Sequence, residues 1–137
     1  MAVYEINVQK AFTASHSVSL PGGTAEPSHE HKWMVTATFR SNRLDETMGA
    51  VIDFRAVDDA LEQVTGPMDG TDLNSAGVLA DGRASAERVA QFIAVGLAAA
   101  LVDQLGPPGG DRAWLRCVNV TEAPGCSASY YADANQT

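Results

Sequence analysis

Basic residues are scarce in this sequence: 9 Lys and Arg stand against 17 Asp and Glu, which gives a formal net charge of −8. No stretch gathers Lys or Arg into a patch. A protein that binds nucleic acid or an anionic membrane through its charge needs such a patch, so neither partner is expected. An anionic substrate would need basic residues placed beside its own site.

Long apolar runs and leader-like segments are also missing. The longest apolar run, 92–102, is much shorter than the about 20 residues that cross a bilayer. Residues 1–5 contain neither a basic segment nor an apolar stretch, so no secretory signal is visible. We therefore expect a cytoplasmic protein, and 137 residues predict one domain, 1–137, with its own core.

Cysteine occurs only twice, at Cys117 and Cys126, and the two are not spaced as metal ligands. We expect Cys117 to be a buried thiol on a strand and Cys126 to be a thiol in a loop. A thiolate metal site is therefore not expected.

Histidine occurs three times, at His16, His29 and His31. His29 and His31 begin an alternating, β-branched run that predicts a strand, on which these two side chains share one face. A hairpin with the preceding strand-like run would bring His16 to the same face. Three neutral imidazoles that converge suit zinc, and the fourth position then serves water or substrate, as in catalytic sites. The alternative is strand histidines that are satisfied by hydrogen bonds.

Hydrophobic periodicity predicts four strands and two helices. In order, these are a strand from residue 3 that ends near 16 or 18, a strand at about 29–40, a helix at 54–64, a helix from about 85, and strands at 113–121 and 127–132. Asp53 is a typical N-cap for the first helix, and the Gly and Pro run at 106–110 is expected to end the second. This is an α+β chain, and its four strands leave open edges that an oligomer would close.

Six segments, in the same order, resemble the motifs of one enzyme family. They are 12–16 (Phe-x-Ala-x-His in the family), 29–31 (His-Gly-His), 49–54 (Gly-Met-Val-x-Asp-Phe), 69–74 (Asp-His-x-x-Leu-Asn), 85–90 (Thr-x-Glu-Asn-x-Ala) and 121–122 (Glu-Thr) with a Ser-x-x-Tyr tail. The chain resembles the 6-pyruvoyl-tetrahydropterin synthase and 6-carboxy-tetrahydropterin synthase family over nearly its whole length.

The resemblance implies a tunnelling fold, in which a four-stranded antiparallel sheet carries two helices on one face. Three such chains close a barrel and two rings stack, which implies a homohexamer. It further implies Zn²⁺ on His16, His29 and His31, and a small heterocyclic substrate bound between subunits.

The sequence departs from the family at the residues that move protons. The usual Cys, four residues before the first His of the His-x-His motif, is Ala25 here, and the partner His of that Cys is Gly70. Glu30 stands where the family has Gly, and it should point away from the metal. The loss of both the Cys and its partner His fits an enzyme that uses a different reaction, and it also fits the decay of an unused site.

Glu26 is the candidate replacement for the missing Cys. It lies three residues before His29, where a subgroup of the family carries Glu, and a carboxylate near zinc can act as a general base or acid. The alternative is a solvated loop glutamate beside Pro27. Asp69 and Asp72 are further catalytic candidates that would orient Glu26 or take a proton, although loop aspartates are usually turn formers.

Glu122 and Ser85 are the candidates for substrate binding. By resemblance, Glu122 receives two N–H donors from the amidine edge of a pterin, a bidentate contact. The alternative is an edge-strand glutamate paired with Arg or water. Ser85 matches the Thr of the family motif, but a helix N-cap is the simpler reading.

Three functions follow from these residues. The first is a zinc-dependent carbon–oxygen or carbon–carbon lyase that acts on a dihydropterin such as 7,8-dihydroneopterin triphosphate, with Glu26 in place of the Cys. The second is a zinc-dependent cyclase or dehydratase with a non-pterin substrate in specialised metabolism. The third is a protein that binds zinc or a pterin without catalysis, or serves as a structural ring.

Overall fold

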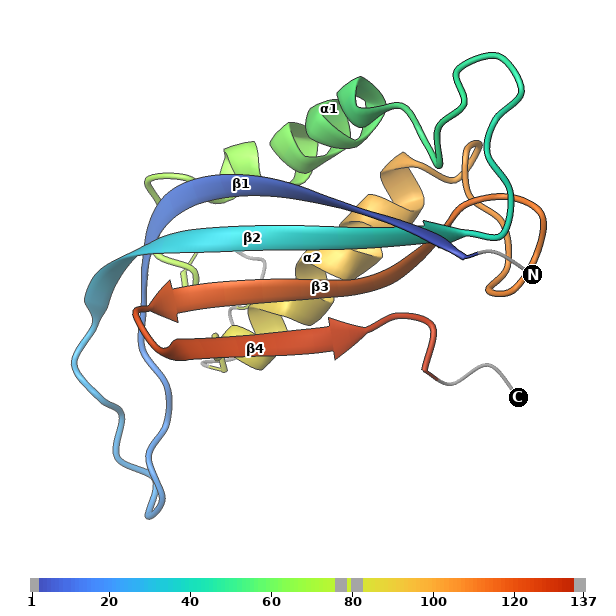
Figure 1. The fold of residues 1–137 in the computed structure, drawn as a ribbon. Coiled ribbons are helices and arrows are strands. Elements are labelled where there is room, and N and C mark those ends of the chain that lie inside the picture. Colours follow the sequence, from blue (N-terminus) through green and yellow to red (C-terminus); the bar gives the residue numbers. More distant parts are fainter. Residues whose placement is uncertain (1–2, 76–78, 80–82, 135–137) are drawn as a thin grey trace.

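The computed structural model describes residues 3–75, 79 and 83–134 (Figure 1). The elements are β1 (Tyr4–His16), β2 (His29–Ser41), α1 (Phe54–Thr65), the short 3₁₀ helix η1 (Gly66–Met68), α2 (Ala86–Ala100), β3 (Trp114–Ala123) and β4 (Cys126–Tyr131). The predicted order of two strands, two α-helices and two strands is confirmed.

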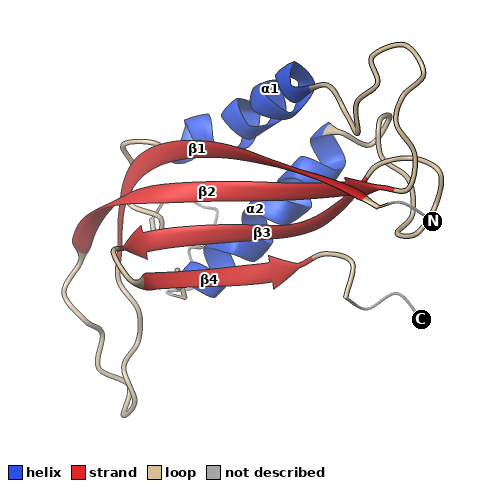
Figure 2. Cartoon of the chain, viewed as in Figure 1, coloured by secondary structure: helices blue, strands red, loops and turns tan. Residues whose placement is uncertain are grey.

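The four strands form one antiparallel sheet in the order β1-β2-β3-β4. Both α-helices lie against the same face of this sheet, and the other face is left uncovered by helices (Figure 2). Each strand therefore lies beside the strand that follows it in the sequence, and all neighbouring strands run antiparallel. The arrangement confirms the α+β class and the predicted four-stranded sheet with two helices on one face.

Alternation along the strands decides which side chains enter the core. In β2, Trp33, Val35, Ala37 and Phe39 face the helices and have no exposed surface, and the residues that alternate with them point to the other face. From β1, Phe12 stacks on Trp33 with ring centroids 6.0 Å apart. Burying each such side chain contributes roughly 1.5–3 kcal/mol, so this face anchors β1 and β2 to the helices.

The helices begin where the sequence predicts. The Asp53 carboxylate caps α1 by accepting the Arg55 backbone N–H at 2.9 Å, and the Arg55 guanidinium also donates to it. These hydrogen bonds from Arg55 hold the pKa of Asp53 below its ordinary value. Ser85 Oγ caps α2 by accepting the Arg88 N–H at 3.2 Å, which confirms the N-cap interpretation of this residue.

The second helix is shorter than predicted. It ends at Ala100, whereas the sequence pointed to the Gly and Pro run at 106–110. Leu101 has φ −109° and ψ 20°, outside the helical region, and its carbonyl accepts the N–H of Gln104 and Leu105 in a turn. The turn keeps Leu101 buried in the core, and this packing ends the helix before the breakers are reached.

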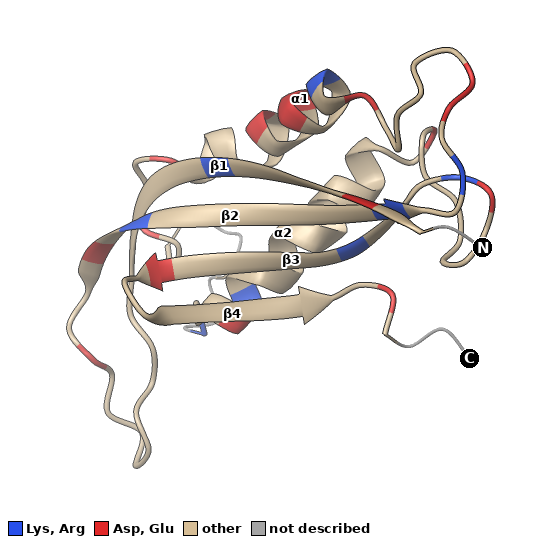
Figure 3. Ribbon diagram, viewed as in Figure 1, with Lys and Arg blue, Asp and Glu red and all other residues tan. Residues whose placement is uncertain are grey.

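Charged residues on β2 and β3 lie near the strand ends (Figure 3), and Lys10 on β1 contacts α1. Lys10 Nζ lies 3.2 Å from both Asp58 and Glu62, and its hydrogen bond with Asp58 is the main cause of a raised pKa. This ion-pair group ties β1 to α1. Neither α-helix in the described chain combines the length and hydropathy that a membrane span requires.

Both cysteine predictions need correction. Cys117 is only partly buried, because it alternates with Val118 and so points to the sheet face without helices. Cys126 is exposed and is the first residue of β4 instead of a loop residue. The β3–β4 turn is short because Gly125 adopts φ 80°, so the strand resumes at once.

Candidate metal centre

The pairing of β1 with β2 brings the three histidines together. His16, the last residue of β1, lies opposite His29, the first residue of β2, and Ala14 lies opposite His31. The predicted hairpin is therefore confirmed. All three histidines share the helix-facing side of the sheet with Trp33, whose ring lies 4.9 Å from that of His16.

The three imidazoles converge closely enough to share one ion. One ring nitrogen from each residue lies within 4.8 Å of the other two. The ring centroids of His16 and His29 are 4.6 Å apart, and those of His29 and His31 are 4.5 Å apart. In the described part of the chain, no other group of three or more His, Cys, Asp or Glu is placed to hold a metal.

Backbone carbonyls set the orientation of two of the rings. His16 Nδ1 donates to Ala84 O at 2.6 Å, and His29 Nδ1 donates to Pro27 O at 3.0 Å. Each of these rings then carries its lone pair on Nε2, which is how carbonyls orient metal-binding histidines. The two lone pairs are thus prepared before any ligand arrives.

His16 Nε2 is the site's unsatisfied atom. His16 is 2% exposed, and among the described residues its Nε2 is the single buried side-chain polar atom without a hydrogen-bond partner. Leaving such an atom unpaired costs roughly 1–3 kcal/mol. A metal ion at the three nitrogens would remove that cost, so the residues present fit zinc.

Glu26 lies beside the histidines and not in open solvent. Its Oε1 accepts the Val18 N–H at 3.1 Å and lies 3.9 Å from His29 Nε2. The side chain is 25% exposed. A small ladder fixes it there, because Glu26 N–H donates to Val18 O at 3.0 Å.

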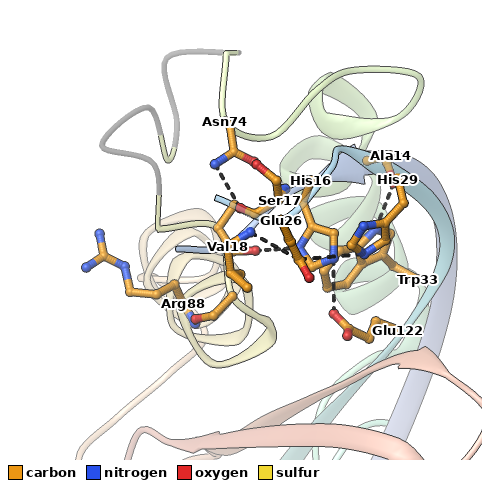
Figure 4. A network of polar contacts seen from close by, with 12 residues as sticks. Ala14, His16, Ser17, Val18, Glu26, His29, Trp33, Asn74, Arg88 and Glu122 are labelled. Atoms are coloured by element: carbon orange, nitrogen blue, oxygen red, sulfur yellow. Dashed lines mark hydrogen bonds and ion pairs between the residues drawn. The ribbon is translucent and has the colours of Figure 1, made fainter. Parts of the chain in front are cut away.

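Glu122 approaches the histidines from β3. Its Oε2 lies 3.4 Å from His16 Nε2, and Figure 4 shows the carboxylate directed at the His16 ring. The β3–β4 register shifts between Thr121 and Ala123, which leaves Glu122 as the extra residue of a β-bulge. Bulges of this kind re-aim side chains beside active sites.

Asp69, Asp72 and Ser85 make contacts elsewhere. Asp69 Oδ1 accepts the Thr13 N–H at 2.9 Å, and Asp72 accepts from the Asn74 N–H and from the Ser75 hydroxyl. These bonds hold the loop 69–74 along the end of β1, next to His16. Ser85 Oγ is used as the cap of α2.

Two cavities adjoin Glu122. One, of 470 Å³, is lined by Glu30, His31, Lys32 and Glu122 among others. The other, of 350 Å³, lies between α2 and β4 and is lined by Glu87, Glu122 and Cys126 among others. Glu30 is exposed and lies opposite Ser15, on the strand face away from the histidines, as predicted.

Some residues of the site have no signal in the sequence. The Ala84 carbonyl orients His16 from 68 residues away, and the Asn74 side chain accepts the Ser17 N–H at 2.8 Å. Carbonyls occur at every position, so residue type does not reveal the first contact. Pro27, two residues from His29, is close enough in sequence to have been suspected.

The comparisons with known proteins agree with this geometry. Residues 5–133 match the family described as 6-pyruvoyl tetrahydropterin synthase. The chain belongs to the 6-pyruvoyl tetrahydropterin synthase family. No curated protein matches the sequence significantly.

Solved structures show the same fold as this family member. The Caenorhabditis elegans 6-pyruvoyl tetrahydropterin synthase is 17% identical with a TM-score of 0.78, over 96% of this chain and 97% of that one. The Plasmodium vivax enzyme is 16% identical with a TM-score of 0.68, over 95% and 98% of the two chains. A P. vivax variant, described as a mutant of a catalytic residue, matches with the same values.

Proposed function

We propose that the protein is a zinc-dependent lyase of the 6-pyruvoyl tetrahydropterin synthase type that acts on a dihydropterin such as 7,8-dihydroneopterin triphosphate. The observation that carries the proposal is the buried, unpaired Nε2 of His16 among three converging imidazoles. Membership of the family supports the substrate class.

His16, His29 and His31 would hold the zinc ion through ring nitrogens. Bound there, zinc supplies a Lewis acid for a hydroxyl or carbonyl oxygen of the substrate. His16 and His29 present their Nε2 atoms because their Nδ1 atoms donate to backbone carbonyls. The buried Trp33 ring packs edge-on against the His16 ring, which is itself 2% exposed.

Glu26 is the proposed acid–base group in place of the missing Cys. Its carboxylate is held by the Val18 N–H and lies 3.9 Å from His29 Nε2, so it borders the volume where a substrate would meet the histidines. The P. vivax variant replaces a glutamate that is described as a catalytic residue. A protein with this fold can therefore have a catalytic glutamate.

Glu122 is the proposed anchor for the amidine edge of the heterocycle, since it lines the 470 Å³ cavity together with His31. Ser85 would contribute a hydroxyl at the N-terminus of α2. Asp69 and Asp72 would act by positioning, because their carboxylates fix the loop beside His16. The proposal keeps the expected cytoplasmic location and the homohexamer.

The test is to incubate zinc-loaded protein with 7,8-dihydroneopterin triphosphate and to follow substrate and product by chromatography. Glu26→Gln should lower kcat by about a hundredfold or more, the usual contribution of a positioned acid–base group. Glu46→Gln is the matched control, because Glu46 is exposed in the loop after β2, at the end of that strand away from the histidines, and it should retain kcat. Absence of turnover by the wild-type protein would remove this function.

A second function is favoured by the residues at positions 25 and 70. Ala25 cannot supply a thiolate, and Gly70 adopts φ 75°, a backbone conformation that a His would take only under strain. The loop is thus built for glycine, which favours a changed reaction: a cyclase or dehydratase with a non-pterin substrate. Failure of pterins to bind the zinc-loaded protein, measured by fluorescence, would favour it over the lyase.

The third candidate, zinc or pterin binding without catalysis, predicts bound zinc and a rate that does not respond to Glu26→Gln. The turnover assay separates the lyase from the other two functions, and pterin binding without turnover would favour the third over the second.

A further inference from the structure

The sheet has an opening beside the histidines, between the start of β2 and the end of β3. Residues 29–33 of β2 pair with β1, but the ladder between β2 and β3 begins only at Met34 and Thr121. The 470 Å³ cavity lies at this opening, because residues of both strands line it. His31 belongs to the helix-facing side of β2 and Lys32 to the other side, so the cavity takes its lining from both faces of the sheet.

Lys32 is the one basic residue at this cavity. All nine Lys and Arg lie in the described part of the chain, and none of the others lines either cavity that adjoins Glu122. The Lys32 side chain is exposed, and among the described residues it forms no ion pair or hydrogen bond. Lys10, by contrast, lies between Asp58 and Glu62. The three N–H donors of the Lys32 amine therefore remain available to a ligand.

The charge of the protein makes this amine important for an anionic substrate. The net charge is −8, and two carboxylates, those of Glu30 and Glu122, line the same cavity. A substrate with several negative charges is repelled by these groups unless a cation lies beside its charged end. Lys32 is the cation that the cavity supplies for this purpose.

The position of Lys32 also suits a substrate that is held at two ends. Glu122, the proposed anchor of the heterocycle, lines the cavity together with His31 and Lys32, so one bound molecule can contact all three. The volume of 470 Å³ falls within the roughly 300–1,000 Å³ of small-molecule sites. A heterocycle at Glu122 therefore leaves its side chain within the same cavity as the Lys32 amine.

We propose that Lys32 binds the anionic group of the substrate side chain and thereby sets the preference for a phosphorylated over a phosphate-free dihydropterin. The inference rests on the substrate class of the proposed function and adds a specificity-determining residue to it. Glu30 lies two residues from Lys32 on the same strand face, so its carboxylate opposes the binding of negative charge and limits how much the cavity accepts.

The first experiment uses zinc-loaded protein and measures kcat and KM for 7,8-dihydroneopterin triphosphate, together with the inhibition constant of phosphate-free 7,8-dihydroneopterin. Lys32→Gln should raise KM about tenfold, the weight of one charge-assisted hydrogen bond, while kcat and the inhibition constant stay unchanged. Lys32→Arg should restore KM, because a guanidinium also binds phosphate. Glu30→Gln should lower KM by about threefold, as expected for an exposed charge.

Arg43→Gln is the matched control, because Arg43 is an exposed cation in the loop after β2, at the end of that strand away from the histidines. It removes the same charge from the whole protein, so KM and the inhibition constant should stay at their wild-type values. Added salt should raise KM in the wild type and raise it less steeply in Lys32→Gln, because salt screens exposed charges.

An unchanged KM in Lys32→Gln, or an equal rise in Arg43→Gln, would overturn this inference and leave the proposed function in place. A KM that does not fall in Glu30→Gln would overturn the role given to Glu30. Absence of turnover by the wild-type protein would instead remove the proposed function. Calorimetry with inorganic triphosphate then decides about Lys32: weaker binding by Lys32→Gln than by Arg43→Gln is expected, and equal binding would overturn the inference.

Discussion

At the scale of single residues, the site depends on backbone groups as much as on side chains. The carbonyls of Ala84 and Pro27 choose which nitrogen of His16 and His29 faces the centre. Position 70 shows the same dependence. Gly70 adopts φ 75° while its N–H donates to Thr13 O at 2.6 Å, so the loop beside β1 requires a left-handed residue there.

Gly70→Ala should lower the free energy of unfolding by about 1 kcal/mol, the cost of a left-handed conformation for a residue with a Cβ. A Cβ at this position would meet nothing within 4 Å, so the loss would come from the backbone alone. Gly70→Asn should lose less, because Asn tolerates this conformation. Urea unfolding of the three proteins measures both differences, and equal stability of G70A and wild type would contradict the prediction.

At the scale of elements, strand register decides whether a metal centre exists. His16 faces His29 across the β1–β2 pair, and both lie on the helix-facing side. A slip of one residue would turn an entire strand's side chains to the other face. The Phe12–Trp33 contact and the buried Val35 and Phe39 make such a slip costly, so the hydrophobic pattern of β2 also positions the ligands.

The two helices meet at Gly96 and Val64, and this contact gives a second prediction. A Cβ on Gly96 would lie 3.0 and 3.1 Å from the two methyl groups of Val64. Overpacking costs about 1–3 kcal/mol, while Ala gains about 1 kcal/mol of helix propensity over Gly. Gly96→Ala should therefore destabilise the protein by about 1 kcal/mol.

The control for this contact is a double-mutant cycle. In a Val64→Ala background the methyl groups are gone, so adding Gly96→Ala should raise the free energy of unfolding. Chemical denaturation of the four proteins gives the coupling. A Gly96→Ala effect of the same sign in both backgrounds would show that the helices do not meet as described.

At the scale of the whole molecule, the sheet is open at β1 and β4 and bare on one face. Polar pairs cross that face: Thr38 donates to Asn7 at 2.6 Å, and Asn119 donates to Ser129 at 2.9 Å. Unpaired edge strands favour pairing with other chains. The proposed homohexamer would close both edges and surround the polar face.

The mass in solution tests this assembly. Multi-angle light scattering of the purified protein should give six times the mass of one chain, and dilution should release trimers before monomers, because edge-to-edge pairing within a ring involves backbone hydrogen bonds. A monomer at micromolar concentration would contradict the expected assembly, although it would leave the chemistry of the three histidines untouched.

The sequence by itself determined the elements and the three histidines of the candidate metal centre. Strand alternation, the N-caps Asp53 and Ser85 and the pairing of His29 with His31 on one face are local, because they depend on residues a few positions apart. The Gly and Pro run at 106–110 predicted an end of α2 that is too late, since the packing of Leu101 ended the helix first. Local patterns predict where an element forms better than where packing stops it.

Only the tertiary structure decided how the site is assembled. The Ala84 carbonyl, the bulge that carries Glu122 and the loop that seats Glu26 meet the histidines through contacts between distant parts of the chain. Such contacts are set by register and by the packing of helices on the sheet, and their partners are often backbone atoms that every residue carries. The sequence therefore predicts the three imidazoles, and the fold alone determines which carboxylates lie beside them.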